Sequence, residues 1–390
     1  MNLKRIRYAA LVAVGMLVFS FCPAAVAGAL QSGSTTPAPS PLAAPVQAAS
    51  EQEVAVFSAD DMKAFVNAAL KADKIRDPMK RCLNFPDPPG SHWSRDGLAA
   101  SCRYNLQETI SLAEFDRLIG SGHAKDLDKR FSSWDADSKR HPNAFYRFLV
   151  VRFGKAAPDR QPLIESWKQQ SPRSAYAYAL SGWNYMNIGW SARGGKPAAE
   201  TADSSFDAME TEIERSRGDI EMAIRLDPHL SAPYAVMIDI GTLVSDPAYA
   251  AEGAEKGVTA TRNRYPTFVQ LARYTASRWH GDARSQQQLL ARVNESIHDE
   301  PLLHVIRATV LCFEAEIDHQ APSDHQWSVY RTVLDDVASF SVLQRVGETA
   351  LDSGQYALAY VYLSEAARFN PADQDVIDER ARAASQMTLH

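Results

Sequence analysis

Residues 343–371 read LQRVGETALDSGQYALAYVYLSEAARFNP and contain the most regular pattern in the chain. Small residues stand in both halves of this stretch, at Gly347 and Ala359, and Gly354 separates the halves. Two antiparallel helices approach closely where small residues meet, so we expect Gly347 and Ala359 to face each other. Pro371 would then stop the second helix. The stretch therefore predicts a helical hairpin.

The residues from Gly347 to Pro371 closely resemble the tetratricopeptide repeat, in which Tyr356 and Leu363 would fill the groove toward the next hairpin. This resemblance implies an all-α fold, with antiparallel helical hairpins stacked into a tetratricopeptide-like α-solenoid. Proteins of this family are mostly binding scaffolds. The resemblance therefore also implies a binding function, by analogy alone.

A partial second copy of the pattern occurs earlier in the chain. Ile220, Ala223 and Pro228 repeat the final spacings of the first unit, while residues 191–202 interrupt the helix pair before them. Helical periodicity continues through most of the chain, and no stretch shows the strict alternation of a β-strand flanked by hairpin turns. We therefore expect a tetratricopeptide-like repeat domain over residues 158–390.

The region before the array, residues 54–157, is also expected to be helical. Ser58 stands three residues before Asp61, and Ser111 stands three residues before Glu114. This is the spacing of a capping box, which marks the start of a helix. We expect this region to be less regular than the array and to pack on the first hairpin of the array.

The first 27 residues have the three parts of a removable secretory signal. Positive charges at Lys4, Arg5 and Arg7 precede an uncharged apolar run, and Ala25-Val26-Ala27 supplies the small-x-small pattern of a cleavage site. A retained membrane anchor is the alternative, but the run is shorter than the ~20 residues that span a bilayer. We expect an exported protein, periplasmic or secreted, with no stable membrane insertion after cleavage.

Residues 28–53 are rich in Ser, Thr, Pro and Ala, a composition that predicts a disordered linker. The chain has a formal net charge of -6, and removal of the three signal cations would make the mature chain more acidic. Nucleic acid is therefore not an expected partner, because its binding needs a basic face. The sequence predicts no cofactor, and it does not indicate the oligomeric state.

The cysteines fit an oxidising compartment. We predict a disulfide between Cys82 and Cys102, which would close a loop of about 20 residues and stabilise by roughly 3 kcal/mol in the chain-entropy treatment. Cys312 lies in an apolar run, so we expect a buried free thiol. Cys22 could be lipidated, but Phe21 precedes it where a small residue is usual. The spacings do not predict a zinc site.

The densest aromatic group comprises Trp183, Tyr185 and Trp190, followed by Arg193 and Gly194. One interpretation is packing between hairpins, with Arg193 paired to an acid. The other is a groove that grips a peptide or a sugar, because Trp, Tyr and Arg dominate binding hot spots. The segment is also similar to the Trp-x-x-Arg-Gly segment of an uncharacterised bacterial exported family, a resemblance that implies no known activity.

Motifs of catalysis and metal binding are sparse. The loop at residues 85–93 combines aromatics and prolines and could either dock a partner or cover the helical stack. Asp318-His319 and Asp324-His325 match no established ligand motif, so no metal site is predicted. No nucleophile elbow or phosphate loop occurs. We expect a non-catalytic scaffold that holds a protein or peptide, with a helical cell-wall glycan hydrolase or lyase using groove carboxylates as the alternative.

Overall fold

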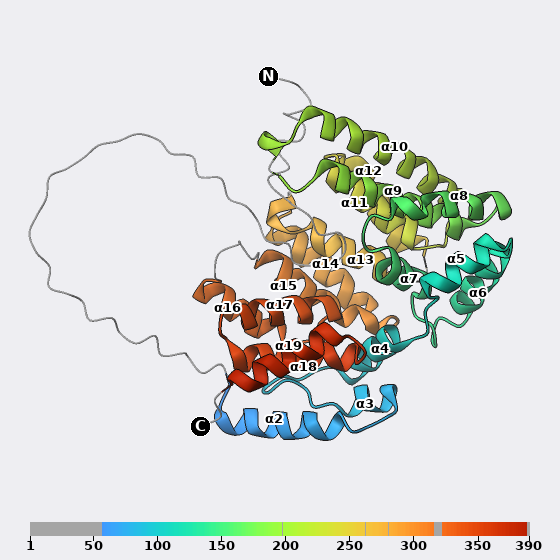
Figure 1. Ribbon diagram of the computed structural model, residues 1–390. Coiled ribbons are helices and arrows are strands. Elements are labelled where there is room, and N and C mark those ends of the chain that lie inside the picture. The colour runs from blue at the N-terminus through green and yellow to red at the C-terminus, as the bar shows by residue number, and fades with distance from the viewer. Residues whose placement is uncertain (1–56, 197, 262, 280, 316–321, 388–390) are drawn as a thin grey trace, which may run out of the picture.

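The computed structural model describes residues 57–387 except 197, 262, 280 and 316–321, and within them every regular element is a helix (Figure 1). This confirms the all-α prediction. The expectations for the signal, for Cys22, for the linker and for Asp318-His319 fall outside the described residues. Among the residues described, no helix combines the length and apolar character that crossing a bilayer requires.

Six α-helices precede the predicted array, and two of them begin at the caps expected from the sequence. The side chains of Ser58 and Ser111 accept hydrogen bonds from the backbone N–H groups of Asp61 and Glu114, both at 3.1 Å. These contacts satisfy N–H groups that have no partner within the helix. The helices are α2 (Ala59–Ala72), α3 (Pro78–Asn84), α4 (Arg95–Leu106), α5 (Leu112–Gly120), α6 (Ala124–Ala136) and α7 (Ala144–Phe153).

Twelve α-helices follow, joined by turns and by short 3-10 helices. The α-helices are α8 (Gln161–Gln170), α9 (Ala175–Arg193), α10 (Asp203–Leu226), α11 (Ala232–Leu243), α12 (Pro247–Thr259), α13 (Tyr265–Tyr274), α14 (Ala283–Ser296), α15 (Val305–Glu314), α16 (Asp324–Val333), α17 (Phe340–Asp352), α18 (Tyr356–Phe369) and α19 (Gln374–Gln386). The 3-10 helices are η1 (Pro158–Arg160), η2 (Ala198–Glu200), η3 (Ser277–Trp279) and η4 (Pro301–His304).

Glycines bring neighbouring helices together. A Cβ placed on Gly182 of α9 would lie 2.6 Å from Ile220 of α10, while one on Gly189 would lie 3.2 Å from the carbonyl oxygen of Met209. The order of these contacts shows that α9 and α10 run antiparallel. Helices α17 and α18 also pack together, but Gly347 faces Leu363, 2.8 Å from its Cβ position, and not the expected Ala359. A glycine opposite a leucine achieves the same close approach.

The N-terminal helices do not all pack where the sequence suggested. Helices α5 and α6 contact α8, and α7 contacts α9, at the expected first hairpin. Helices α3 and α4 instead contact α18, at the far end of the chain (Figure 1). The expectation of packing on the first hairpin is therefore wrong for α3 and α4, because Arg81 of α3 and Trp93, which precedes α4, find partners on α18.

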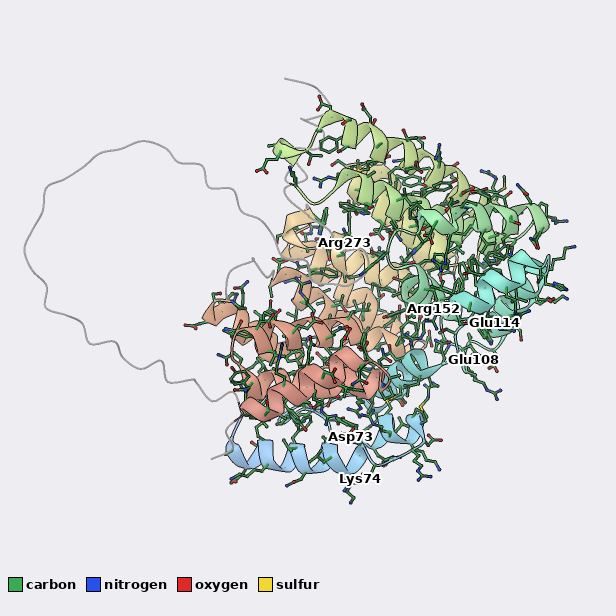
Figure 2. The ribbon with its side chains drawn as sticks, in the orientation of Figure 1. Asp73, Lys74, Glu108, Glu114, Arg152 and Arg273 are labelled. Carbon is green, nitrogen blue, oxygen red and sulfur yellow. A yellow bond between two sulfur atoms is a disulfide. The ribbon has the colours of Figure 1, made fainter. Side chains whose placement is uncertain are left out.

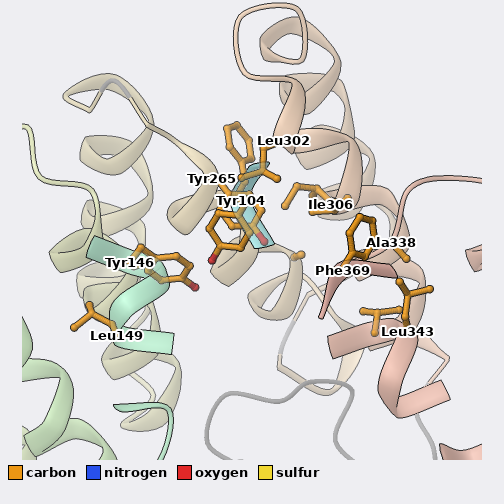
Figure 3. Close-up of a cluster of buried hydrophobic side chains, with 14 of the residues drawn as sticks. Tyr104, Tyr146, Leu149, Tyr265, Leu302, Ile306, Ala338, Leu343 and Phe369 are labelled. Carbon is orange, nitrogen blue, oxygen red and sulfur yellow. The ribbon is translucent and has the colours of Figure 1, made fainter. Parts of the chain in front are cut away.

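A cluster of buried side chains joins the N-terminal helices to the middle of the array (Figure 3). The ring of Tyr265 on α13 lies 5.1 Å from that of Tyr104 on α4 and 6.2 Å from that of Tyr146 on α7, as measured between centroids. Both pairs meet edge to face, the geometry that aromatic quadrupoles favour. The cluster continues through Ile306 toward Phe369 of α18. The N-terminal helices thus bridge widely separated parts of the array.

The disulfide between Cys82 and Cys102 is present, as predicted, and ties α3 to α4. Cys312 is also disulfide-bonded, so the expectation of a free thiol is wrong. Burial of Cys312 within α15 was correctly inferred from its apolar neighbours, but burial does not distinguish a thiol from half of a disulfide.

Candidate functional site

Trp183 lies in the core. Its side chain is fully buried, and its indole N–H donates to the carbonyl oxygen of Phe153 at 2.7 Å. Its ring meets the ring of Tyr146 edge to face at 5.9 Å. Helix α9 is contacted by α7, α8, α10 and α11, so most of its circumference is covered. The role of Trp183 is therefore to pack α9 against α7.

Arg193 and Gly194 shape the end of α9. Arg193 is buried, and its Nη1 donates to the carbonyl oxygens of Gly194 at 2.9 Å and Lys196 at 3.2 Å. Burial lowers the pKa of Arg193, and its guanidinium lies 5.7 Å from the ring centroid of Phe206. Gly194 has a φ of 74°, which glycine adopts readily. Together these residues hold the turn from α9 toward α10.

Tyr185 belongs to a polar cluster between α8, α9 and α10. Its hydroxyl donates to Glu165 at 3.2 Å, and the guanidinium of Arg215 lies 5.7 Å from its ring centroid. Lys168 donates to Asp219 at 2.9 Å and pairs with Glu165 at 2.9 Å. This cluster was not predicted, because its members come from three helices and match no motif.

Within this cluster, Lys168 and Ser181 resemble a catalytic serine–lysine pair, with 3.5 Å between Nζ and Oγ. Such a pair needs a neutral amine as its base. Burial alone lowers the pKa of Lys168, but hydrogen bonds to Asp219 and Glu165 outweigh it and raise the pKa overall. Ser181 is also fully buried. The cluster therefore acts as an ion network that joins three helices.

Trp190 contacts a different part of the array. The guanidinium of Arg273, labelled in Figure 2, lies 5.9 Å from the ring centroid of Trp190 and 4.7 Å from that of Trp279. Arg273 pairs with Asp239 at 3.2 Å. Burial raises the pKa of Asp239 to about 6, although the charge of Arg273 opposes the shift. Trp190 is partly buried and joins α9 to α13 through Arg273.

The five residues singled out from the sequence thus have separate neighbours. Trp183 contacts α7, Tyr185 contacts Glu165, Trp190 contacts Arg273, and Arg193 contacts the turn that contains Gly194. Trp183 and Trp190 are seven residues apart, a spacing that places them on one helix face, but that face meets two different neighbouring helices. Tyr185 and Trp190 keep partly exposed side chains.

A cleft of about 600 Å³ lies between α10 and the turn that joins α11 to α12. Arg217 pairs with Asp246 at 3.0 Å and places its guanidinium 4.2 Å from the ring centroid of Tyr249. Four carboxylates and one guanidinium line the cleft. The lining residues are Asp207, Glu210, Thr211, Ile213, Glu214, Arg217, Val244 and Asp246.

The cleft was not predicted from the sequence. Asp207, Glu210 and Glu214 follow helical spacing on α10, but such a stripe of charge is more often a solvated face. It becomes one wall of a cleft because Val244 and Asp246 face it from the next hairpin. No group of three His, Cys, Asp or Glu residues within the described ranges could hold a metal ion.

Comparison of the chain with protein-family models, with curated proteins and with solved structures gave no match in any of the three. The function is therefore inferred from the geometry of the chain.

Proposed function

We propose that the protein is an exported, non-catalytic scaffold of tetratricopeptide-like hairpins that holds a segment of a protein partner in the cleft beside α10. The observation that carries the proposal is the cleft itself, about 600 Å³ in volume and open between two helical hairpins. Antiparallel pairing of α9 with α10 through glycines supports the repeat architecture. The signal-like residues 1–27 support export to the periplasm or beyond.

The charge of the cleft favours a basic segment. Asp207, Glu210, Glu214 and Asp246 outnumber Arg217 along the lining. Complementary charge guides association and selects among partners more than it adds affinity. A lysine- or arginine-containing peptide is therefore the occupant that this lining would attract, and acidic polymers would be repelled.

The alternative, a glycan hydrolase or lyase, has less support. Such enzymes need a carboxyl with a raised pKa that faces a second carboxylate across the substrate site. Burial raises the pKa of four carboxyls to about 6 or 7, and these lie outside the cleft: Asp135, Asp239, Glu365 and Glu379. Asp239 and Glu365 are buried beside arginines, where a glycan would not reach them.

Charge reversal in the cleft tests the proposal. The probe is a short fluorescent peptide of alternating lysine and serine, compared with a glutamate–serine peptide. Glu214→Lys should weaken binding of the lysine peptide about tenfold or more, because it places a cation in the lining. Glu221→Lys is the matched control, since Glu221 is an exposed acid of α10 outside the cleft.

Two outcomes would overturn the proposal. Failure of the full-length protein to bind the lysine peptide would exclude a basic occupant. Equal losses in Glu214→Lys and Glu221→Lys would show that the acidic surface attracts the peptide without any role for the cleft. Circular dichroism of both variants should match that of the unmodified protein, because both positions are on the surface of α10.

A further inference from the structure

The segment that contains α2–α4, residues 58–107, makes buried polar contacts with α18 and an ion pair between Asp73 and Arg380 of α19. We call this segment the clasp. Arg368 of α18 donates from Nε to the carbonyl oxygen of Cys82 at 2.7 Å and pairs with Asp87 at 3.2 Å. Arg81 of the clasp donates to the carbonyl oxygen of Ala367 at 2.9 Å. Each side of the junction thus donates a hydrogen bond to a backbone carbonyl on the other side.

Aromatic contacts complete the junction. The rings of Trp93 and Phe369 are stacked, with centroids 6.3 Å apart and an interplanar angle of 2°. The indole N–H of Trp93 donates to the carbonyl oxygen of Leu334 at 2.8 Å. On α2, the ring of Phe65 meets that of Tyr360 edge to face at 6.3 Å. The clasp therefore covers aromatic side chains of α18.

Most of these groups belong to one covalently closed loop. Asp87 and Trp93 lie between Cys82 and Cys102, and Arg81 directly precedes the first cysteine. The disulfide restricts the loop to few conformations and so presents these groups to α18 together. In the chain-entropy treatment, opening a loop of this length favours the disordered form by roughly 100-fold.

The polar contacts of the junction contribute little net stabilisation. Arg368 and Glu365 have fully buried side chains, 3.0 Å apart. Nη2 of Arg368 and Oε1 of Glu365 have no hydrogen-bond partner within the described part of the chain. The desolvation of buried ions offsets much of their mutual attraction. Attachment of the clasp therefore depends on its aromatic contacts and on a loop already held in shape.

The junction of α5–α7 with the array is different. It is an aromatic core in which the Phe115 ring lies 5.8 Å from Trp167 of α8 and 5.7 Å from Phe148 of α7. Phe131 of α6 stacks on the same Trp167. These contacts need no disulfide to align them. Helix α4 is also anchored away from α18, where Tyr104 meets Tyr265, and the disulfide ties α3 to this anchored helix.

We propose that the clasp closes on α18 and α19 only when Cys82 and Cys102 are oxidised, so that the fold contains a redox-dependent closure between its two ends. This device is independent of the partner proposed above. On closure each cysteine gives up one proton and one electron as the S–S bond forms. A disulfide-bearing oxidant takes up both electrons and both protons and leaves as a dithiol.

Hydrogen exchange on the full-length chain tests this closure. In Cys82→Ala/Cys102→Ala, amides of α18 and α19 should exchange roughly 100-fold faster, while α9 and α10 keep their protection. Cys312→Ala is the matched control, because it replaces a buried cysteine that does not lie in the clasp, and it should leave α18 and α19 protected. Unchanged exchange in α18 and α19, or equal acceleration in α9 and α10, would overturn the proposal.

A second variant covers the case in which the double alanine variant does not fold. Trp93→Ala keeps the disulfide and removes the largest aromatic contact with Phe369. It should accelerate exchange in α18 and α19 while α3 and α4, still tied together, remain protected. Protection of α18 and α19 that survives this substitution would show that the contact of Trp93 does not hold the clasp closed, and it would overturn the proposal.

Discussion

Arg368 donates its Nε–H to the backbone carbonyl of Cys82, which lies 286 residues earlier in the chain, at 2.7 Å. Both groups are fully buried. A guanidinium that satisfies a main-chain carbonyl beside a disulfide fixes the position of the N-terminal loop on α18. The contact also makes α18 depend on residues far outside its own hairpin, and this dependence can be measured.

Arg368→Ala should be among the most destabilising single substitutions in the C-terminal half. It would leave the buried Glu365 without its ionic partner at 3.0 Å, and removing one partner of a buried pair costs about 3–5 kcal/mol. Asp87 would keep Arg95 at 3.1 Å. Urea unfolding followed by circular dichroism measures the change. Arg382→Ala is the control: its partner Asp352 is 80% exposed, so the change should stay within about 0.5 kcal/mol. Equal effects would contradict a buried role for Arg368.

Stability should also depend on pH through Glu365. Burial raises the pKa of its carboxyl from 4.5 to about 7, with Asp87 raising it further and Arg368 and Arg380 opposing the shift. The folded protein therefore holds a proton that the unfolded chain has released between these values. The stabilisation from this group is complete below about pH 4.5 and is lost as pH rises through about 7.

Glu365→Gln isolates this contribution, because glutamine resembles the protonated carboxyl and does not titrate. The free energy of unfolding of the unmodified protein, relative to that of Glu365→Gln, should fall by on the order of a few kcal/mol from pH 5 to pH 8. Parallel pH profiles for the two proteins would show that Glu365 titrates normally.

Two glycines of the α9–α10 pair should respond in opposite directions to alanine. A Cβ on Gly182 would lie 2.6 Å from Ile220 and 3.1 Å from the carbonyl oxygen of Ser216, so Gly182→Ala should destabilise by about 1–3 kcal/mol. Gly218 is an exposed helical glycine of α10 with no atom within 4 Å of its Cβ position. Gly218→Ala should therefore stabilise by about 0.5–1 kcal/mol. Thermal unfolding of both variants decides the matter, and a stabilising Gly182→Ala would contradict the close packing of α9 on α10.

The local parts of this structure could be predicted from the sequence, because their causes are local. The caps at Ser58 and Ser111 and the pairing of Cys82 with Cys102 depend on residues near one another in the chain. The junction of Arg368 with the clasp could not be predicted from the sequence, because Arg368 binds a backbone carbonyl and every residue has one. Its position depends on how helices far apart in the sequence pack together.

The candidate site was also predictable only in part from the sequence. Small and apolar residues occur all around the first half of α9, a pattern typical of a helix buried on every face. That pattern is a sufficient reason to place Trp183 in the core on sequence grounds alone. The cleft beside α10 needs Asp246 from the next hairpin, and no spacing within α10 indicates that neighbour.

Substitution of Trp183 and substitution of Trp190 should therefore have different effects on stability. Trp183→Ala would remove a fully buried ring and its hydrogen bond to Phe153, and should destabilise by about 3–5 kcal/mol. Trp190→Ala would remove a partly exposed ring that lies beside Arg273, at a cost of about 1–2 kcal/mol. Chemical denaturation of the two variants gives the comparison. A larger loss for Trp190→Ala would mean that its contact with Arg273 is the stronger junction.

Binding in the cleft should weaken as salt is added. Asp207, Glu214 and the other carboxylates of the lining are open to solvent in part, so their attraction for a basic segment is screened over a Debye length of about 10 Å at 0.1 M salt and about 3 Å at 1 M. Fluorescence anisotropy of the lysine–serine peptide should show its Kd rising by about tenfold or more across that range. In Glu214→Lys the same titration should be flatter, because part of the attraction has already been removed. A Kd that does not change with salt would mean that apolar contacts hold the peptide, and the acidic lining would then have no part in selecting it.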